Sequence, residues 1–450
     1  MKKLTGITSL VLALIMLLAC VSCDHTHEFG EWTADENTHS RVCTVKKCEE
    51  KESGAHTYGD AVVSKAPGAQ EEGQLEYTCT VCGYKKTEAV PQRLSLTLVE
   101  FEEFDTHTAL QKKYLASNVI NVPATAAGVL EQSYQATPVF TWKLDGLADD
   151  EVLVNYVLEI SRNEDMSDPM SYTSRFYSYD RANGFNFLVR TNYYWQVTAN
   201  VKLADGTEIS QKSKVSTFKT LDGPRTLCVD GIANFRDLGG KDCTGGVLRQ
   251  ELIYRCGRLN ANNKKGTTVS STGLKVLKEL GIKSEIDLRG DTSDTVHQNG
   301  FKKDGSETMY SWGGEQIQYF LCPAIYSASM LNTAEGQKMV KDTFEILAKP
   351  ENYPVIFHCS IGTDRTGITA FLIEGVCGVD LETIERDYLF SNFANIGSSR
   401  SEATFKSITA PVQAMKGANF EEKCYNYLIK IGVTAEQIES VRNILIEKTN

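Results

Sequence analysis

Residues 358–367 read His-Cys-Ser-Ile-Gly-Thr-Asp-Arg-Thr-Gly and are the most informative part of the C-terminal half of the chain. Cys359 and Arg365 stand six positions apart within it. The apolar, β-prone run 353–357 before it predicts a buried strand, and the run 368–375 after it predicts the start of a helix. A strand, a tight loop and a helix N-terminus together make a cradle for an anion, because unpaired backbone N–H groups and the helix dipole converge there.

The residue types in this loop suit the binding and attack of a phosphate group. A cysteine at the mouth of such a cradle has a depressed pKa and is present as a nucleophilic thiolate. An arginine adds a planar fork for two phosphate oxygens, and a glycine permits backbone angles closed to other residues. The predicted catalytic residues are Cys359, Arg365 and Thr366, with His358 supporting the loop. The predicted phosphate contacts come from Ser360, Ile361, Gly362, Thr363, Asp364 and Arg365.

The chemistry predicted from this set is covalent catalysis in two steps. The thiolate of Cys359 takes up the phosphoryl group, and water then releases phosphate from the phosphocysteine. No metal or other cofactor is needed for this reaction. The alternative is a buried structural cysteine beside a surface arginine, since a cysteine and an arginine at this spacing occur often by chance. The complete pattern HCxxGxxRTG after an apolar run is far more specific and favours the phosphate loop.

The loop resembles that of the cysteine-dependent protein tyrosine phosphatases. Asp364 directly before Arg365 narrows the resemblance to a bacterial branch with an HCxxGKDRTG loop, which includes secreted mycobacterial tyrosine phosphatases and dual-specificity phosphatases. Three further segments resemble signatures of that branch: Asn234-Phe235-Arg236-Asp237-Leu238-Gly239-Gly240, Ile286-Asp287-Leu288-Arg289, and Asp387-Tyr388-Leu389. The resemblance covers about 223–450 and implies an α/β cysteine-phosphatase fold.

The resemblance also implies the acid and the substrate class. In that branch the aspartate before the loop arginine is the usual general acid, which is Asp364 here, and Asp287 is the second acidic residue expected near the pocket. The alternatives are a charge interacting with the helix dipole for Asp364 and a strand-end cap for Asp287. Thr363 stands where the branch has a lysine, which favours phosphotyrosine or simple phosphomonoesters over multiply phosphorylated lipids.

Three functions therefore stay open at the level of the sequence. The first is a protein-tyrosine or dual-specificity phosphatase acting on a phosphotyrosine-bearing protein or a small phosphomonoester. The second is an inositol-phosphate or phosphoinositide phosphatase that uses the same loop. The third is a non-catalytic surface protein that binds phosphorylated ligands, against which the intact Cys359, Arg365 and Thr366 argue.

Charge and the N-terminal residues bear on partners and location. The 450-residue chain has a net charge of −11, so nucleic acid is not an expected partner. Met1-Lys2-Lys3 and the apolar run 7–18 predict an export leader, and the sequence Leu-Leu-Ala-Cys ending at Cys20 resembles a bacterial lipobox. We therefore expect an extracytoplasmic lipoprotein anchored to the membrane through Cys20, with simple secretion or lipidation at Cys23 as alternatives. The sequence carries no signal for the oligomeric state.

Residues 24–90 contain a repeated phrase with cysteine pairs. His27-Glu28-Phe29-Gly30 and His56-Thr57-Tyr58-Gly59 are 29 positions apart, and each precedes a cysteine pair. Cys79-Thr80-Val81-Cys82-Gly83 has the form of a zinc knuckle. The predicted metal ligands are His27, Cys43, Cys48, His56, Cys79 and Cys82. One set of His27, Cys43, Cys48 and His56 would leave the second pair incomplete, and a disulfide within each pair is the alternative to a structural zinc.

The remaining residues complete a multidomain prediction. Residues 91–222 alternate β-prone runs with turns and predict an antiparallel β-sandwich that resembles a fibronectin type III domain. From 223 onward strands and helices alternate, as in an α/β layer with its ligand loop at the carboxyl end of a central strand. The expected division is a leader at 1–23, a Cys/His-rich region at 24–90, the sandwich at 91–222 and a catalytic domain at 223–450.

Overall fold

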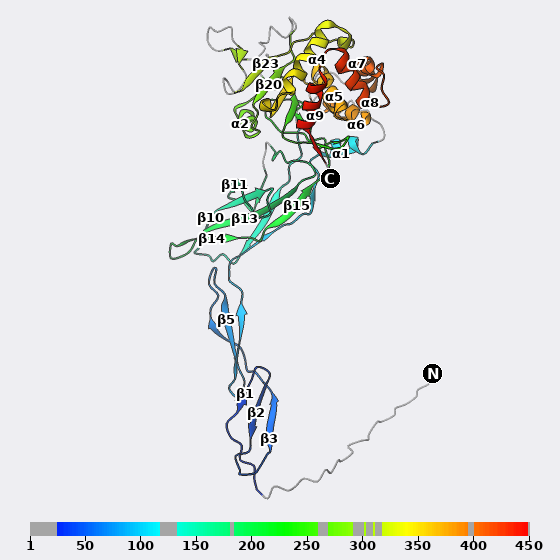
Figure 1. The fold of residues 1–450 in the computed structure, drawn as a ribbon. Helices are drawn as coiled ribbons and strands as arrows, with labels where there is room; N and C mark the ends of the chain where they lie inside the picture. Colours follow the sequence, from blue (N-terminus) through cyan, green and yellow to red (C-terminus); the bar gives the residue numbers. More distant parts are fainter. Residues whose placement is uncertain are drawn as a thin grey trace, which may run out of the picture. The chain divides into compact units, whose positions relative to one another are not determined.

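The chain divides into two compact units, Met1–Ser95 with Leu144–Val152 and Leu96–Lys143 with Leu153–Asn450. The computed structural model describes residues 25–117, 133–180, 184–259, 269–290, 301–302, 309–310, 317–394 and 400–448 (Figure 1). The predicted leader, with Cys20 and Cys23, lies outside these residues. None of the helices within these ranges is both long and apolar enough to cross a membrane.

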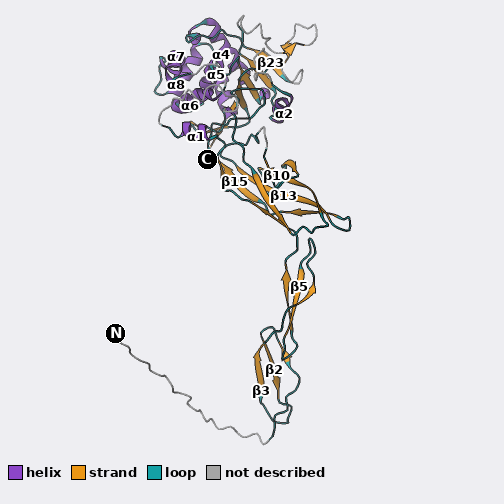
Figure 2. Cartoon of the chain, turned by 180° about the vertical axis from the view of Figure 1, so that it is seen from behind, coloured by secondary structure: helices purple, strands orange, loops and turns teal. Residues whose placement is uncertain are grey.

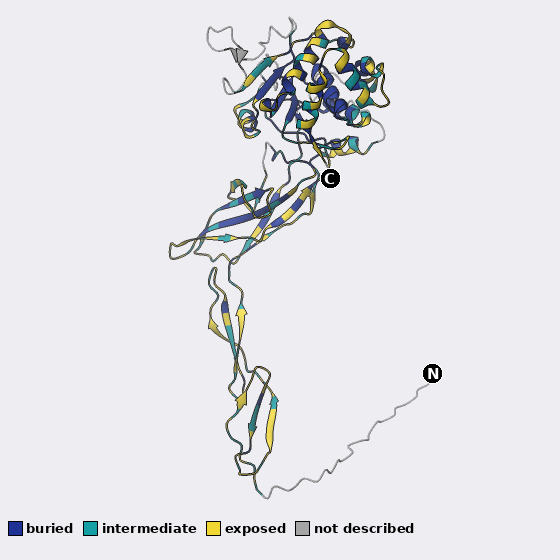
Figure 3. Ribbon diagram, in the orientation of Figure 1, coloured by how far each residue is buried: buried dark blue, intermediate teal, exposed yellow. Residues whose placement is uncertain are grey.

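The first unit consists mainly of two small antiparallel sheets. They contain the strands β1 (Thr33–Ala34), β2 (Thr38–Val42) and β3 (Lys51–Ala55), and then β4 (Val62–Lys65), β5 (Gly73–Thr78) and β6 (Lys85–Val90). Most of their residues are exposed or half-buried (Figure 3). The buried residues of 25–90 are His39, Cys43, Gly73 and Cys79, so this segment has no apolar core of its own.

The second unit begins with the predicted β-sandwich. Its larger sheet runs β11-β10-β13-β15-β8 with β14 beside β13, and its smaller sheet runs β12-β9-β7. Figure 2 labels β10, β13 and β15 of the larger sheet. Aromatic rings join the two layers. The ring centroid of Phe140 in β9 lies 4.9 Å from that of Trp195 in β13 and 5.8 Å from that of Phe218 in β15. The strands are β7 (Ser95–Leu98), β8 (Glu103–Phe104), β9 (Phe140–Asp145), β10 (Val152–Ser161), β11 (Met170–Ser174), β12 (Ser178–Tyr179), β13 (Asn192–Lys202), β14 (Glu208–Lys212) and β15 (Ser216–Thr220).

A five-stranded sheet forms the centre of the C-terminal part, in the order β16-β19-β24-β20-β23. The strands β19, β24, β20 and β23 are parallel, and β16 is antiparallel at the edge. Their bounds are β16 (Arg236–Asp237), β19 (Ile253–Cys256), β20 (Ser284–Asp287), β23 (Gln318–Leu321) and β24 (Val355–His358). Further short strands are β17 (Asp242–Cys243), β18 (Gly246–Leu248) and β25 (Ile446–Lys448) in one sheet, and β21 (Phe301–Lys302) with β22 (Met309–Tyr310) in another.

Helices cover both faces of the central sheet. Val355 and Phe357 of β24 point into the larger core, whereas Ile356 points into the smaller core with α2, as the two-residue period of a strand requires. Every residue of α5 is buried, since this helix lies between the sheet and its neighbours α6 and α8. The helices are α2 (Ser271–Glu279), α4 (Ala334–Leu347), α5 (Asp364–Val376), α6 (Leu381–Phe390), α7 (Glu402–Gln413), α8 (Phe420–Lys430) and α9 (Ala435–Leu445), with 3-10 turns η3 (Met330–Asn332), η4 (Pro350–Asn352) and η5 (Ser391–Phe393).

The sandwich and the C-terminal part are in direct contact. The two pack into one compact unit, and helix α1 (Ala109–Leu115), which sequence patterns did not indicate within the sandwich, contributes to the core of the C-terminal part. The Tyr114 hydroxyl of α1 donates to the carbonyl of Arg386 at 3.1 Å. Arg225 donates to the carbonyls of Phe187 and Asn186 in the sandwich, so buried polar contacts join the parts.

Candidate active site

The loop 359–363 connects the central strand β24 to helix α5, as its sequence predicts. Parallel pairing sets His358 beside Asp287 of β20 and beside Cys256 of β19, so the loop leaves the carboxyl edge of the sheet at its middle. Thr363 is the N-cap of α5 and makes no side-chain cap. The first N–H groups of the helix are therefore left for another acceptor, which is the requirement for an anion site at a helix N-terminus.

Side chains outside the loop hold its carbonyl groups and thereby orient its N–H groups. Arg258 Nε donates to the Ser360 carbonyl at 2.9 Å, and Arg255 Nη2 donates to the Gly362 carbonyl at 2.8 Å. Asn234 Nδ2 donates to the same Gly362 carbonyl at 2.9 Å. Because the N–H and C=O of successive peptides point to opposite sides of such a turn, carbonyls fixed outward leave N–H groups facing the centre.

A fully buried charge cluster lies behind these donors. Asp387 Oδ1 accepts from Arg236 Nε at 3.1 Å, and Asp387 Oδ2 accepts from Arg255 Nη1 at 2.9 Å. Lys241 Nζ lies 2.8 Å from Glu374 and 3.5 Å from Asp387. Arg236 Nη1 also donates to Asn234 Oδ1 at 2.5 Å. The cluster thus positions both Arg255 and Asn234, the two donors to the Gly362 carbonyl.

The candidate nucleophile Cys359 is buried, with 1% of its surface exposed. Burial opposes ionisation of the thiol, but the charge of Arg365 and hydrogen bonds from the hydroxyl and N–H of Thr366 outweigh it and lower the pKa of Cys359. The Thr366 hydroxyl is itself buried and makes no other hydrogen bond of good geometry among the described residues. This environment favours a thiolate at the bottom of the loop.

Arg365 and His358 each hold a position near the nucleophile. Arg365 Nη1 donates to the carbonyl of Ala324 at 3.0 Å, and Nη2 lies 3.5 Å from Ser360 Oγ. His358 is fully buried between Glu285, whose Oε1 lies 2.9 Å from Nε2, and the Cys359 carbonyl, 3.4 Å from Nδ1. Its ring therefore contacts the backbone of the nucleophile and supports the loop from below.

Asp287 makes contacts that do not suit a proton donor. Its Oδ1 accepts from Arg289 Nε at 2.8 Å, and its Oδ2 accepts from Arg289 Nη2 at 2.6 Å and from the Tyr319 hydroxyl at 2.8 Å. Burial disfavours the charge, but His358 and Arg289 prevail and lower the pKa of Asp287. An ionised carboxylate with both oxygens occupied accords with the strand-end cap, the structural alternative raised by the sequence.

Asp364 lies at the first turn of α5, beside the loop. Its two oxygens form a bidentate pair with Arg400, at 2.8 Å from Nε and 2.8 Å from Nη2. Burial is the main cause of the raised pKa of Tyr326. The nearby charge of Asp364 and a hydrogen bond with its carboxylate raise this pKa further. Asp364 therefore lies near the phosphate cradle, and its partner Arg400 was not indicated by any sequence motif.

Gly362 has the most constrained backbone in the loop. Its φ is +72°, and a Cβ there would lie 2.4 Å from the carbonyl carbon and oxygen of Cys256. We expect Gly362→Ala to shift the loop and lower kcat/KM by about 100-fold, since a displacement of about 1 Å at a catalytic site has this effect. Gly281→Ala is the matched control, because Gly281 has φ +64° but nothing within 4 Å. Equal loss of activity in both variants would show that backbone strain alone, not the loop's close packing, is responsible.

The predicted metal ligands fall into two groups of four, not one complete and one incomplete set. The groups are His25, His27, Cys43 and Cys48, and His39, His56, Cys79 and Cys82. The suggested set that combined His27 with His56 is therefore wrong, because His56 lies with the second cysteine pair. His25 and His39 were missed, since neither belongs to the repeated phrase. Cys43, Cys79 and Cys82 form no disulfide with any other described residue.

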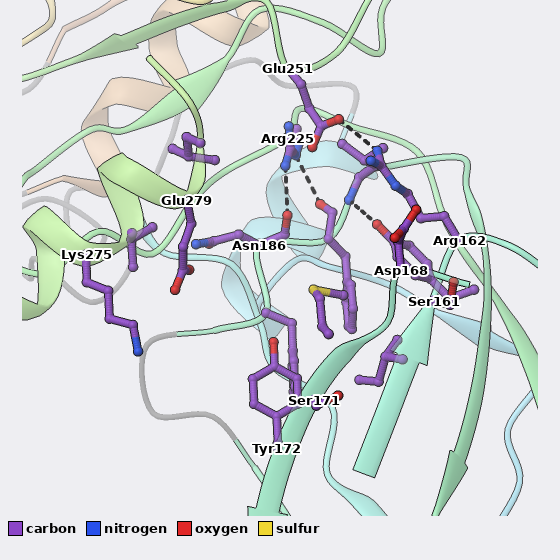
Figure 4. Close-up of a pocket in the computed structure, with 18 of the residues that line it drawn as sticks. Ser161, Arg162, Asp168, Ser171, Tyr172, Asn186, Arg225, Glu251, Lys275 and Glu279 are labelled. Carbon is purple, nitrogen blue, oxygen red and sulfur yellow. Dashed lines mark hydrogen bonds and ion pairs between the residues drawn. The ribbon is translucent and has the colours of Figure 1, made fainter. Parts of the chain in front are cut away.

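A cavity of about 530 Å³ lies between the sandwich and α2 (Figure 4). Arg162 there pairs with Glu251 at 2.7 Å, and Arg225 donates to the Asn186 carbonyl at 2.8 Å. No residue of 358–367 lines this cavity. Its arginines are held by partners of the chain itself, so we assign the cavity no part in the chemistry of Cys359.

Comparison with known proteins agrees with this geometry. Residues 227–447 match the family model described as "Tyrosine phosphatase family", so this part of the chain is similar to that family. A Cupriavidus necator protein named "Putative tyrosine-protein phosphatase" is 27% identical over 193 residues, which are 39% of this chain and 66% of that protein. A "Tyrosine-protein phosphatase" of Nostoc commune is 27% identical over 123 residues, 26% of this chain and 42% of that protein. The chain thus matches less than two thirds of either relative's length.

Two solved structures of the catalytic core of Siw14 also match. One is titled as the core catalytic domain of the PP-IP phosphatase from S. cerevisiae in complex with citrate; it is 16% identical and covers 36% of this chain and 86% of its own, with a TM-score of 0.22. The other is 15% identical and covers 37% and 95%, with a TM-score of 0.20. At these scores the likeness adds nothing to the assignment of the site.

Proposed function

We propose that the chain is a phosphomonoester hydrolase that acts on phosphotyrosine in proteins or peptides through a phosphocysteine intermediate. The observation that carries the proposal is the buried Cys359, whose pKa is lowered despite burial by Arg365 and Thr366, beneath a loop whose carbonyls are bound from outside. The family match over 227–447 supports the reaction class.

The reaction follows from the positions of these groups. The phosphate oxygens accept from the loop N–H groups and from Arg365, and the Cys359 thiolate attacks phosphorus. The bond from phosphorus to the leaving oxygen breaks, and that oxygen takes a proton. Water then attacks the phosphocysteine, the S–P bond breaks, and phosphate leaves with the thiolate restored. Thr366 stabilises the thiolate as the leaving group of this second step.

Asp364 is the proposed donor of the proton to the leaving oxygen. It is the acidic residue of the loop itself, and its pairing with Arg400 must loosen when substrate binds so that the carboxyl can carry a proton. Asp287, the second acidic residue suggested by the sequence, suits this role less well, because Arg289 and Tyr319 both donate to it and its pKa is lowered.

The choice of phosphotyrosine rests on the charge around the loop. Thr363 is fully buried, and its hydroxyl accepts from Asn234 Nδ2 at 3.3 Å, so this position presents no cation to a second phosphate. Arg289 and Arg400 beside the site are paired with Asp287 and Asp364. A substrate with one phosphate and an aromatic leaving group suits this balance better than a polyphosphorylated one.

Aryl phosphates of graded leaving-group acidity test the proposal. The full chain should hydrolyse them and a phosphotyrosine peptide, and Asp364→Asn should slow the poorest leaving groups by about 100-fold while the best ones change little. Asp380→Asn, which removes the carboxylate that caps α6 at Thr383, is the control for a general loss at a helix N-terminus. Uniform loss across the series would remove Asp364 as the acid. Faster release of phosphate from inositol hexakisphosphate than from the peptide would overturn the substrate class.

The location and anchoring of the protein remain proposals of the same kind. We propose that the chain acts outside the cytoplasm, held to the membrane through a lipid on Cys20, on the basis of the leader sequence alone. The resemblance of the sandwich to fibronectin type III domains stays a prediction as well.

A further inference from the structure

We propose that residues 25–90 bind two structural zinc ions, each through two cysteines and two histidines, and that the second ion joins the first repeat to the second. This inference goes beyond the proposed phosphatase activity and does not depend on it. It concerns the first compact unit alone.

The distances within each group are those of a tetrahedral zinc site. One ligand atom from each residue lies within 4.8 Å of all the others in its group. Zn–S and Zn–N bonds of about 2.3 and 2.1 Å at tetrahedral angles give an S···N edge of about 3.6 Å. The S···N distances are 3.8 Å for Cys43–His25, 3.4 Å for Cys48–His27, 3.8 Å for Cys79–His39 and 3.4 Å for Cys82–His56.

The two groups are built by the same backbone scheme. An isolated bridge pairs Phe29 with Cys43 in the first repeat and Tyr58 with Cys79 in the second. The hydroxyl of Thr44 donates to the Glu28 carbonyl at 3.0 Å, and the hydroxyl of Thr80 donates to the Thr57 carbonyl at 3.0 Å. The phrase that begins at His27 or His56 is thus held against its cysteine pair twice in the same way, which indicates one ligand arrangement used twice.

The ligands take the place of a hydrophobic core in this segment. Its buried residues, apart from Gly73, are His39, Cys43 and Cys79, and all three are proposed ligands. Sheets of so few short strands do not bury enough apolar surface to fold alone, and domains of this size rely on metals or disulfides. A metal at each group would supply the missing stabilisation.

Neighbouring groups orient the ligands for a metal. His56 Nε2 donates to the Asp35 carbonyl at 2.8 Å, which leaves the lone pair of Nδ1 directed at the site, as is usual for a metal-bound histidine. The Tyr84 N–H donates to Cys82 Sγ at 3.5 Å, an interaction that favours a thiolate in a zinc knuckle. Asp35 belongs to the first repeat, so this support also crosses between the repeats.

His39 connects the second site to the first repeat. His39 lies in β2 of the first repeat, four residues before Cys43, whereas the other three ligands of its group belong to the second repeat. The position four residues before Cys79 is Leu75. The second repeat therefore has no histidine at the position that corresponds to His39, and offers none to a further site. In the first site, His25 takes the place that His39 has in the second site, because no earlier repeat precedes it.

Zinc accounts for these residues better than disulfides do. A disulfide within each cysteine pair would use the four sulfurs but would not explain why two histidines lie beside each pair. Two sulfurs and two imidazoles in a tetrahedral arrangement are the donor set that zinc prefers. The eight residues of the two groups are all used when each group holds one zinc ion.

Metal analysis of the full chain, purified without added reductant or chelator, tests the proposal. We expect two zinc ions per chain, and titration with Co²⁺ should give two equivalents with the visible bands of tetrahedral cobalt and its thiolate charge-transfer absorption. His39→Leu should lower the content to one ion per chain, and His25→Leu should do the same at the other site. Cys243→Ser, which changes a free cysteine outside both groups, should keep two.

The outcomes separate the parts of the proposal. No bound zinc together with Cys43–Cys48 and Cys79–Cys82 disulfides in mapped peptides would overturn both sites. Two zinc ions retained in His39→Leu would overturn the link between the repeats. Loss of both ions in His39→Leu, with one ion retained in His25→Leu, would show that the second site is needed to fold the first. Phosphatase turnover is measured alongside and is expected to be unchanged in both variants, so these results stand whether or not the catalytic proposal holds.

Discussion

Replacing Cys359 with serine is expected to lower turnover of a phosphotyrosine peptide by roughly 10⁴-fold or more, the effect of removing a covalent nucleophile. The serine hydroxyl is a much weaker acid than the thiol, so the charge of Arg365 and the hydrogen bonds of Thr366, which lower the pKa of Cys359, do not suffice to ionise it. Steady-state phosphate release by the full chain measures the effect. Acid quenching of the wild type should also trap phosphate on the peptide that contains Cys359.

The variant should still bind substrate, because the loop N–H groups and Arg365 are unchanged. We expect its affinity for a phosphotyrosine peptide, measured by calorimetry, to stay within a few-fold of that of the wild type. Cys243→Ser is the matched control for loss of a thiol, since Cys243 lies in β17 and not in the loop. Equal turnover by Cys359→Ser and the wild type would end the covalent mechanism. Binding without turnover in the wild type would favour the phospho-ligand-binding alternative.

The loop and its place in the fold could be predicted from the sequence because local rules determine them. The apolar run 353–357 predicted the strand β24, and the loop motif with the run after it predicted the start of helix α5. The alternation of β-prone runs and turns over 91–222 predicted strands in the region that contains β13 and β15. What the sequence did not indicate is how distant residues meet. Helix α1 carries no pattern that distinguishes its packing on the catalytic part from a turn of the sandwich.

The supporting charges of the site were hidden for the same reason. Asn234 and Arg236 belong to the motif at 234–240, but their role depends on contacts with Arg255 and Asp387, which the motif does not reveal. Arg255 is a charged residue within a β-prone run, which by itself favours an exposed side chain. Its burial depends on a carboxylate more than 100 positions away, and no spacing rule connects the two.

Replacing Asp387 with asparagine is expected to cost about 3–5 kcal/mol of the free energy of unfolding, the range for breaking a buried ion pair. Asp387 is 1% exposed and faces Arg236, Arg255 and Lys241. Glu374, the other carboxyl of the cluster, has its pKa raised to about 7 by burial, so it is only partly ionised at neutral pH. Asp387 therefore carries most of the compensating charge, and its loss leaves buried cations without a counter-ion.

The dependence on pH distinguishes this electrostatic effect from a packing defect. Burial raises the pKa of Asp387, but the charges of Arg236, Lys241 and Arg255 outweigh this effect and hold the pKa well below its ordinary value. A carboxyl with a depressed folded-state pKa stabilises the fold above its unfolded pKa of about 3.9, and this contribution is lost as the pH falls further. The difference in stability between wild type and Asp387→Asn, from urea unfolding of the second unit, should be full at neutral pH and shrink below about pH 4.

Two controls place the effect in the charge cluster and connect it to the active site. Glu345→Gln, which removes an exposed pair with Lys349 at 3.9 Å, should change the free energy of unfolding by less than about 1 kcal/mol. Asp387→Asn should also lower kcat, although Asp387 touches no substrate, because Arg255 and Asn234 hold the Gly362 carbonyl and depend on the cluster for their positions. A variant as stable as the wild type at pH 7 would contradict the assignment of Asp387 as the main counter-ion. Lost stability with unchanged kcat would separate the cluster from the loop.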